Sequence, residues 1–129
     1  MRRHRHGTLL DSFRYAFAGL VYVLRAERNA RVHLAATILV VSLSAWLRLS
    51  RIEWLFMIMA IALVFAGEML NTVVELVLDL VAPQQNTLAK HAKDVAAGAI
   101  LIAAIAAAIT GLIVLGPPLW ERVRSLWGA

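Results

Sequence analysis

Five polar residues recur at helical spacing in a stretch of the chain that is otherwise apolar. They are Glu68, Asn71, Thr72, Glu75 and Asp79. At about 100° per residue, they fall within an arc of about 100° on one side of a helix. A polar stripe on an apolar helix must face other protein or a water-filled cavity. Carboxylate and amide oxygens can take up protons or hold a hard divalent cation, so this polar stripe predicts acid–base or metal chemistry.

The depth of Glu68 in a membrane suits a general base. A hydrocarbon core of about 30 Å, counted from Trp54 at about 1.5 Å per residue, ends near Val74. Glu75 and Asp79 then lie at or just beyond that surface, and Glu68 lies roughly 10 Å inside it. We therefore regard Glu68 as the strongest candidate for a catalytic carboxylate.

Two other segments bring charged residues to the same surface. Glu27 closes a basic N-terminal segment, and Lys93 and Asp94 open the last apolar stretch. Carboxylates together with basic groups suggest bound Mg²⁺ and phosphate oxygens. Two simpler interpretations stay open: Glu27 could form a helical ion pair with Arg31, and Lys93–Asp94 could be a plain charged helix start.

The composition indicates a membrane protein. Of 129 residues, 61% are apolar and 16% are charged, against about 45–50% and about 25% in ordinary soluble domains. So small a chain cannot hide this excess in a core, and disorder is excluded by the same composition. The chain has no cysteine, which excludes disulfides and thiolate metal sites.

Three apolar stretches are candidates for membrane spans, which need about 20 apolar residues each. Tryptophans lie at the ends of these stretches, as expected at the headgroup level of a bilayer. We predict one domain over residues 1–129, with a basic amphipathic surface helix in 1–31 and transmembrane helices at 32–49, 53–82 and 94–118.

Cap signals give the expected limits of the helices. Residues 8–30 read as one amphipathic helix, and Thr8 with Asp11 three residues later resembles a capping box. Such a helix, apolar on one side and rich in arginine on the other, would lie in the membrane interface. Thr87 can start the last helix, and Pro117–Pro118 is expected to end it.

The distribution of basic residues predicts the orientation. Residues 1–31 hold seven basic and two acidic residues, so they carry the whole formal charge of +5. With three spans and a cytoplasmic N-terminus, nine Lys and Arg lie inside and four lie outside, as the positive-inside rule requires. Nucleic-acid binding is the competing explanation of the basic segment.

The motifs resemble those of a known family. The run 68–75 (EMLNTVVE), followed by Asp79, resembles the signature of the prokaryotic diacylglycerol kinase and undecaprenol kinase family. Residues 92–99 (AKDVAAGA) look like the second conserved block of that family. Its N-terminal block is similar to Glu27-Arg28-Asn29 after Tyr15-x-x-x-Gly19. The likeness spans roughly residues 10–115, with the blocks in the order and spacing of the family.

The resemblance implies an all-α, integral-membrane homotrimer that transfers the γ-phosphate of MgATP to a lipid hydroxyl in a bacterial inner membrane. Glu68 looks like the catalytic base and Asn71 like the active-site amide, while Glu27 and Glu75 look like the magnesium ligands. The nucleotide contacts that the resemblance implies are Tyr15, Glu27, Glu75, Asp79, Lys93 and Asp94. Nucleic acid is then not needed as a partner.

Two questions stay open at this point. A small transporter or channel could use the same acidic residues to carry ions, and it would move ions without consuming ATP. The lipid could be diacylglycerol or undecaprenol. Details around Glu27-x-Asn29, Asn71-Thr72 and the lysines before Asp94 are more similar to the undecaprenol kinase branch.

Overall fold

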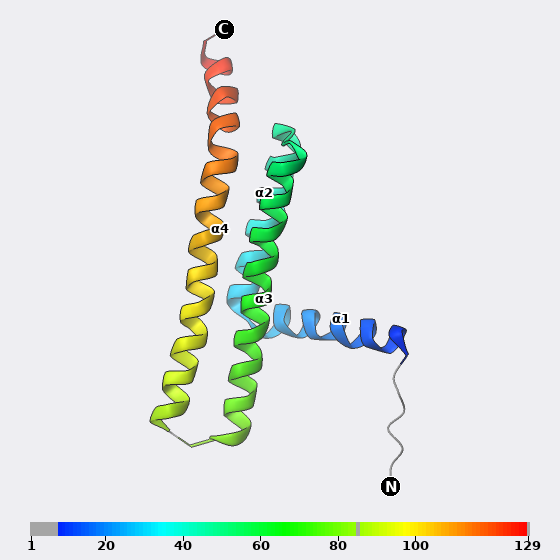
Figure 1. The fold of residues 1–129 in the computed structure, drawn as a ribbon, viewed down its shortest axis with the longest axis vertical. Helices are drawn as coiled ribbons and strands as arrows, with labels where there is room; N and C mark the ends of the chain where they lie inside the picture. The colour runs from blue at the N-terminus through cyan, green and yellow to red at the C-terminus, as the bar shows by residue number, and fades with distance from the viewer. Residues whose placement is uncertain (1–7, 85, 129) are drawn as a thin grey trace.

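The computed structural model describes residues 8–84 and 86–128, and every regular element in those ranges is a helix. Helix α2 contacts both α3 and α4, and the three lie side by side, while α1 projects from them at a steep angle (Figure 1). This arrangement confirms the predicted all-α class, with one N-terminal helix and three long apolar ones. The bounds are Leu9–Ala26 for α1, Arg28–Leu47 for α2, Arg51–Val81 for α3 and Thr87–Trp127 for α4.

Helices α2, α3 and α4 are each long and apolar enough to cross a membrane. Most of their large apolar side chains are exposed on the surface of the single chain. This pattern is typical of helices that face lipid or other membrane helices, because apolar side chains can be exposed to lipid without contacting water.

Helix α1 begins with the predicted capping box. The backbone N–H of Thr8 donates to Asp11 Oδ2 at 2.9 Å, and the Asp11 N–H donates to Thr8 Oγ1 at 3.3 Å. The backbone N–H of Thr8 and, after it, the Thr8 hydroxyl, which also donates to Asp11 Oδ2 at 2.9 Å, hold the pKa of the Asp11 carboxyl below its ordinary value. The first seven residues of the predicted surface segment lie outside the described residues.

The expectation of one helix over residues 8–30 is wrong, because the chain turns a corner at Glu27. This residue has extended backbone angles, φ −97° and ψ 124°, and it separates α1 from α2. The Arg31 guanidinium donates to the carbonyl of Arg25 at 2.9 Å and to that of Leu24 at 3.5 Å. Arg31 thus satisfies carbonyls that the end of α1 leaves without helical partners.

Tight caps also reverse the chain between α2 and α3. Arg48 adopts a left-handed conformation, φ 57° and ψ 50°, and the Leu49 N–H returns to the Ser44 carbonyl at 3.2 Å. Ser50 then caps α3 through reciprocal hydrogen bonds with Glu53. At the opposite end, the side chain of Asn86 accepts from two backbone N–H groups and α4 begins at Thr87, as predicted.

The prediction that Pro117–Pro118 ends the last helix is also wrong, because α4 continues to Trp127. Proline removes its own N–H donor, but membrane helices tolerate this where the surroundings compensate. Val114 and Leu115, just before the prolines, pack against Met57 of α3. Beyond the prolines, the Arg122 guanidinium lies 5.6 Å from the centre of the Trp46 ring on α2.

Candidate active site

Glu68 lies in the middle of α3, and only 1% of its surface is exposed. Asn71 and Thr72, one turn further along the same face, are buried as well. The Thr72 hydroxyl donates to the Glu68 backbone carbonyl at 2.9 Å, so it is satisfied within the helix. The polar stripe therefore faces protein at its Glu68 end, as its position on an apolar helix requires.

The partner of Glu68 from another helix is His33 of α2. Its Nε2 atom lies 3.2 Å from Glu68 Oε1, although the ring N–H is not aligned for a hydrogen bond and Oε1 has no hydrogen-bond donor among the described residues. His33 is not among the site residues that the sequence pattern predicts. The available signal was its type, because histidine is the one titratable residue between Val32 and Leu47.

Glu75 is held by Asn71, one turn before it on α3. Asn71 Nδ2 donates to Glu75 Oε1 at 3.0 Å, and this leaves Asn71 Oδ1 buried without a partner among the described residues. A buried amide oxygen is costly unless it accepts a hydrogen bond or binds a cation. The pair therefore presents a carboxylate and a free carbonyl oxygen in one place.

Glu27 reaches the same region from the corner between α1 and α2. The carboxylates of Glu27 and Glu75 both lie close enough to Glu68 for their charges to act on it. Within residues 8–84 and 86–128, no three His, Asp or Glu side chains gather closely enough to hold a metal by themselves. A cation at Glu27 and Glu75 would need further oxygen ligands from water or from a bound phosphate.

At the turn between α3 and α4, Lys93 Nζ lies 2.7 Å from Asp79 Oδ1. Both side chains are well exposed, so the ion pair adds little stability. Asp79, Lys90, Lys93 and Asp94 line a polar recess of about 850 Å³ at this turn. Lys93 and Asp94, near the start of α4, thus lie beside this recess.

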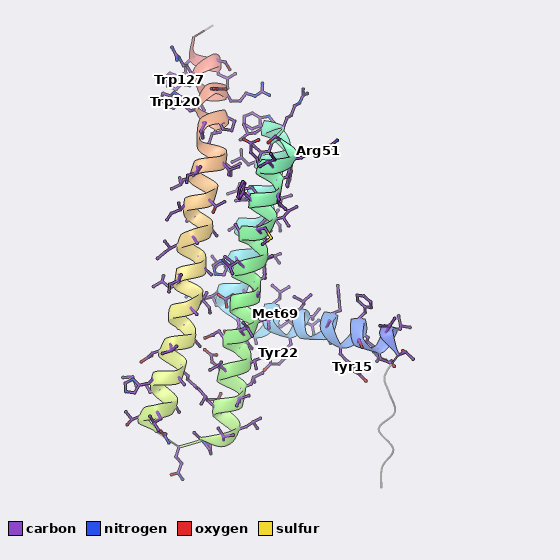
Figure 2. All side chains as sticks on the ribbon, viewed as in Figure 1. Tyr15, Tyr22, Arg51, Met69, Trp120 and Trp127 are labelled. Atoms are coloured by element: carbon purple, nitrogen blue, oxygen red, sulfur yellow. The ribbon has the colours of Figure 1, made fainter. Side chains whose placement is uncertain are left out.

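Tyr15 is not brought to the other predicted residues within one chain. It lies on the part of α1 that projects away from α3 (Figure 2), and 72% of its surface is exposed. The alternative ion pair between Glu27 and Arg31 is absent from the described residues, where Arg31 instead contacts the backbone of α1.

We expect Arg31→Ala to loosen the corner that carries Glu27. Loss of the hydrogen bonds to the end of α1 should cost about 1 kcal/mol, so the last amides of α1 should exchange about fivefold faster. Hydrogen–deuterium exchange measures this effect. Arg28→Ala is the matched control, because Arg28 is an exposed arginine at the same corner. Equal exchange rates in the two variants would contradict the role given to Arg31.

A family model, described as prokaryotic diacylglycerol kinase, matches residues 14–115. The diacylglycerol kinase of Synechocystis is 46% identical over 112 residues, which cover 86% of this chain and 64% of that protein. The undecaprenol kinase of Bacillus subtilis is 37% identical, over 91% of this chain and 95% of its own length. The diacylglycerol kinase of Escherichia coli is 34% identical over 78% of this chain and 83% of its own length.

The family model covers every residue predicted for the site, from Tyr15 to Asp94. The match covers 64% of the Synechocystis protein, so this chain spans less than two thirds of the length of that relative. Three membrane-capable helices, together with this kinship, make the protein a multi-pass membrane protein. The matched residues and the shared motifs lead to one conclusion: the chain belongs to the prokaryotic diacylglycerol kinase family.

Proposed function

We propose that this protein is a lipid kinase that transfers the γ-phosphate of ATP to the hydroxyl of diacylglycerol or undecaprenol. The observation that carries the proposal is the buried carboxylate of Glu68 on a membrane helix, with the Asn71–Glu75 pair toward the end of α3 that meets the polar recess. Membership of the family supports the same activity. The family resemblance supports a bacterial inner membrane as the location of the enzyme, and the distribution of basic residues supports an N-terminus in the cytoplasm.

Glu68 is the general base of the proposed reaction. As the lipid hydroxyl oxygen bonds to the γ-phosphorus, its proton passes to the Glu68 carboxylate. The bond between the γ-phosphorus and the bridging β–γ oxygen breaks, and ADP leaves. A base within the membrane surface suits an acceptor whose hydroxyl is tied to the bilayer by its apolar chains.

Glu27, Glu75 and Asn71 fit a magnesium ion. Their donors are carboxylate and amide oxygens, and Asn71 Oδ1 is buried without a partner among the described residues. Magnesium is usually held by one or two carboxylates together with water and substrate phosphates. When bound, it would neutralise charge on the phosphates, and Asn71 would hold the Glu75 carboxylate in place through the hydrogen bond of 3.0 Å.

The polar recess at the α3–α4 turn is the proposed place for the ATP phosphates. Lys93 can exchange Asp79 for a phosphate oxygen, because their ion pair is exposed. Asp94 lines the recess on the same side. Phosphoryl transfer depends mainly on such positioning and charge neutralisation, so a glycine-rich phosphate loop is not required.

Self-association is part of the proposal. One chain leaves Tyr15, Asp79 and Asp94 exposed, and three membrane helices are too few to surround the polar stripe along its whole length. We propose the homotrimer that the family resemblance implies, in which copies of the chain cover these groups.

A phosphate-transfer assay tests the function. Purified protein in mixed micelles should transfer label from [γ-³²P]ATP to diacylglycerol, to undecaprenol or to both, and only when Mg²⁺ is present. Thin-layer chromatography of the lipid extract separates the two products. Ion flux into liposomes without ATP consumption, together with unlabelled lipid, would contradict the kinase and favour a transporter.

A further inference from the structure

The pairing of Glu68 with His33 connects two helices at the centre of the site. Glu68 is buried on α3, and His33 of α2 brings Nε2 to 3.2 Å from its Oε1. A buried carboxylate needs a partner, because its desolvation is otherwise costly. Among the described residues, no donor completes a hydrogen bond to Oε1. His33 is therefore the group that is best placed to do so after a small rotation of the ring.

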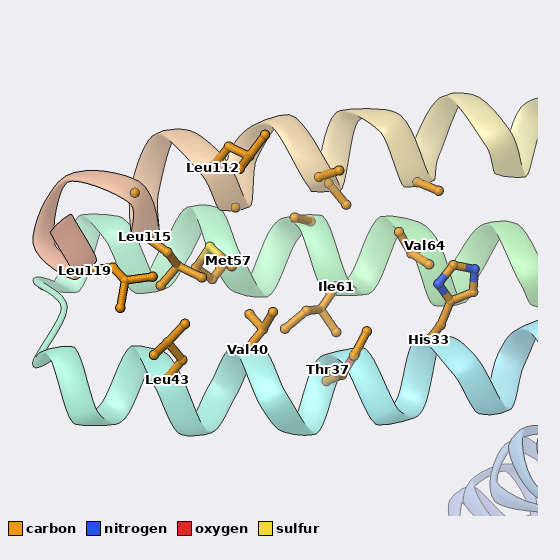
Figure 3. Close-up of a pocket in the computed structure, with 17 residues that line it drawn as sticks. His33, Thr37, Val40, Leu43, Met57, Ile61, Val64, Leu112, Leu115 and Leu119 are labelled. Atoms are coloured by element: carbon orange, nitrogen blue, oxygen red, sulfur yellow. The ribbon is translucent and has the colours of Figure 1, made fainter. Parts of the chain in front are cut away.

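His33 also lies beside an apolar cavity. It lines one end of an apolar cavity of about 560 Å³ between α2, α3 and α4 (Figure 3). His33 and Thr37 are the two polar residues among those that line this cavity. The His33 side chain is 24% exposed. The ring thus lies both at the cavity and beside the Glu68 carboxylate.

A carboxylate base works only if one oxygen lies within about 2.6–3.2 Å of the proton it removes. A glutamate side chain has three rotatable torsions, and the described structure gives Oε1 no other donor to fix them. Nucleophilic and basic groups in enzymes are often oriented by a third group in this way. In apo structures such hydrogen bonds are often poorly aligned and become shorter when substrate binds.

We infer that His33 is a positioning residue for Glu68: its Nε2–H holds Oε1, so that Oε2 faces the lipid hydroxyl. This inference rests on the proposed function and extends it to a residue outside the polar stripe. His33 does not touch the reacting atoms in this scheme. It acts by selecting one rotamer of the base.

Two substitutions of His33 test the inference in the full-length purified protein. His33→Leu removes the N–H donor, and kcat should fall on the order of 100-fold, the cost of misplacing a reacting group by about 1 Å. His33→Gln keeps an N–H donor of similar reach and should restore kcat at least about tenfold relative to His33→Leu. The KM for ATP should change by less than about twofold in both, because only the chemical step is affected.

Thr37→Val is the matched control. Thr37 lies one turn further along α2 and lines the same cavity, but among the described residues it makes no hydrogen bond to Glu68. Its kcat should equal that of the wild type, whereas a merely structural role of this helix face would make it fall too. Equal kcat values for His33→Leu and His33→Gln would overturn the inference. In that case an active wild type would still support the lipid kinase.

A spectroscopic measurement tests the contact between His33 and Glu68 without relying on turnover. In protein labelled with ¹⁵N-histidine, the His33 Nε2 resonance should shift in Glu68→Gln and stay in place in Glu53→Gln, because Glu53 lies at the start of α3, about four turns before Glu68. An unshifted Nε2 resonance in Glu68→Gln would overturn the inference even if the wild type phosphorylated neither lipid. This measurement does not use His33→Leu, so an unshifted resonance would also overturn the inference if that variant failed to fold.

Discussion

Glu68→Gln is expected to transfer phosphate to lipid about 10³-fold more slowly than the wild type while it binds ATP with nearly unchanged affinity. A positioned general base contributes about 10²–10⁴-fold to a rate, and the amide cannot accept the hydroxyl proton. Glutamine has the same shape as glutamate, so the buried position, 1% exposed, should repack without a cavity. The amide oxygen can still face His33, which keeps the α2–α3 contact.

Two measurements separate chemistry from binding in this variant. The lipid-labelling assay gives kcat, and titration with a fluorescent ATP analogue gives the dissociation constant. Glu53→Gln is the matched control on the same helix. Glu53 caps the start of α3 through Ser50, and glutamine serves equally well in a capping box. Normal turnover by purified Glu68→Gln would remove Glu68 from the role of base.

Hydropathy and cap signals predicted most of the fold. Apolar length identified three spans, and the capping box at Thr8 and Asp11 lies where the sequence indicated. The corner at Glu27 was missed because the residues around it, 25–31 (RAERNAR), contain no glycine or proline that would indicate a helix end. The break depends on the contact of Arg31 with the backbone of α1, which follows from packing in three dimensions. The predicted helix end at Pro117–Pro118 was wrong for a similar reason. Contacts with α2 and α3 support α4 on both sides of the prolines.

The site could be predicted as far as it lies on one helix. Glu68, Asn71 and Glu75 share a face of α3 because helical geometry places them there, and the structure shows Asn71 bound to Glu75. Contacts between helices were a different matter. The pair of Lys93 with Asp79 and that of His33 with Glu68 depend on how α3 packs against its neighbours. The place of Tyr15 depends on surfaces beyond one chain.

Glu75→Gln is expected to weaken the apparent affinity for Mg²⁺ by at least about tenfold. The substitution removes one negative charge from the oxygen set of Glu27, Glu75 and Asn71. It leaves the local structure in place, because the glutamine carbonyl can still accept from Asn71 Nδ2, as the carboxylate does at 3.0 Å. Lipid labelling at a series of Mg²⁺ concentrations, with ATP saturating, measures the change. Glu121→Gln, an exposed acid on α4, is the control.

The response to added Mg²⁺ distinguishes a metal ligand from a base. If Glu75 holds the cation, high Mg²⁺ should restore much of the activity of Glu75→Gln, because binding is weakened and the proton acceptor is intact. The same concentrations should leave Glu68→Gln inactive, because saturating the metal site supplies no base. Asn71→Asp should lie between them: it can still offer an oxygen, but two adjacent carboxylates repel where the amide donated to Glu75. An unchanged Mg²⁺ dependence of Glu75→Gln would assign the cation to other oxygens and leave Glu75 a charged residue beside the base.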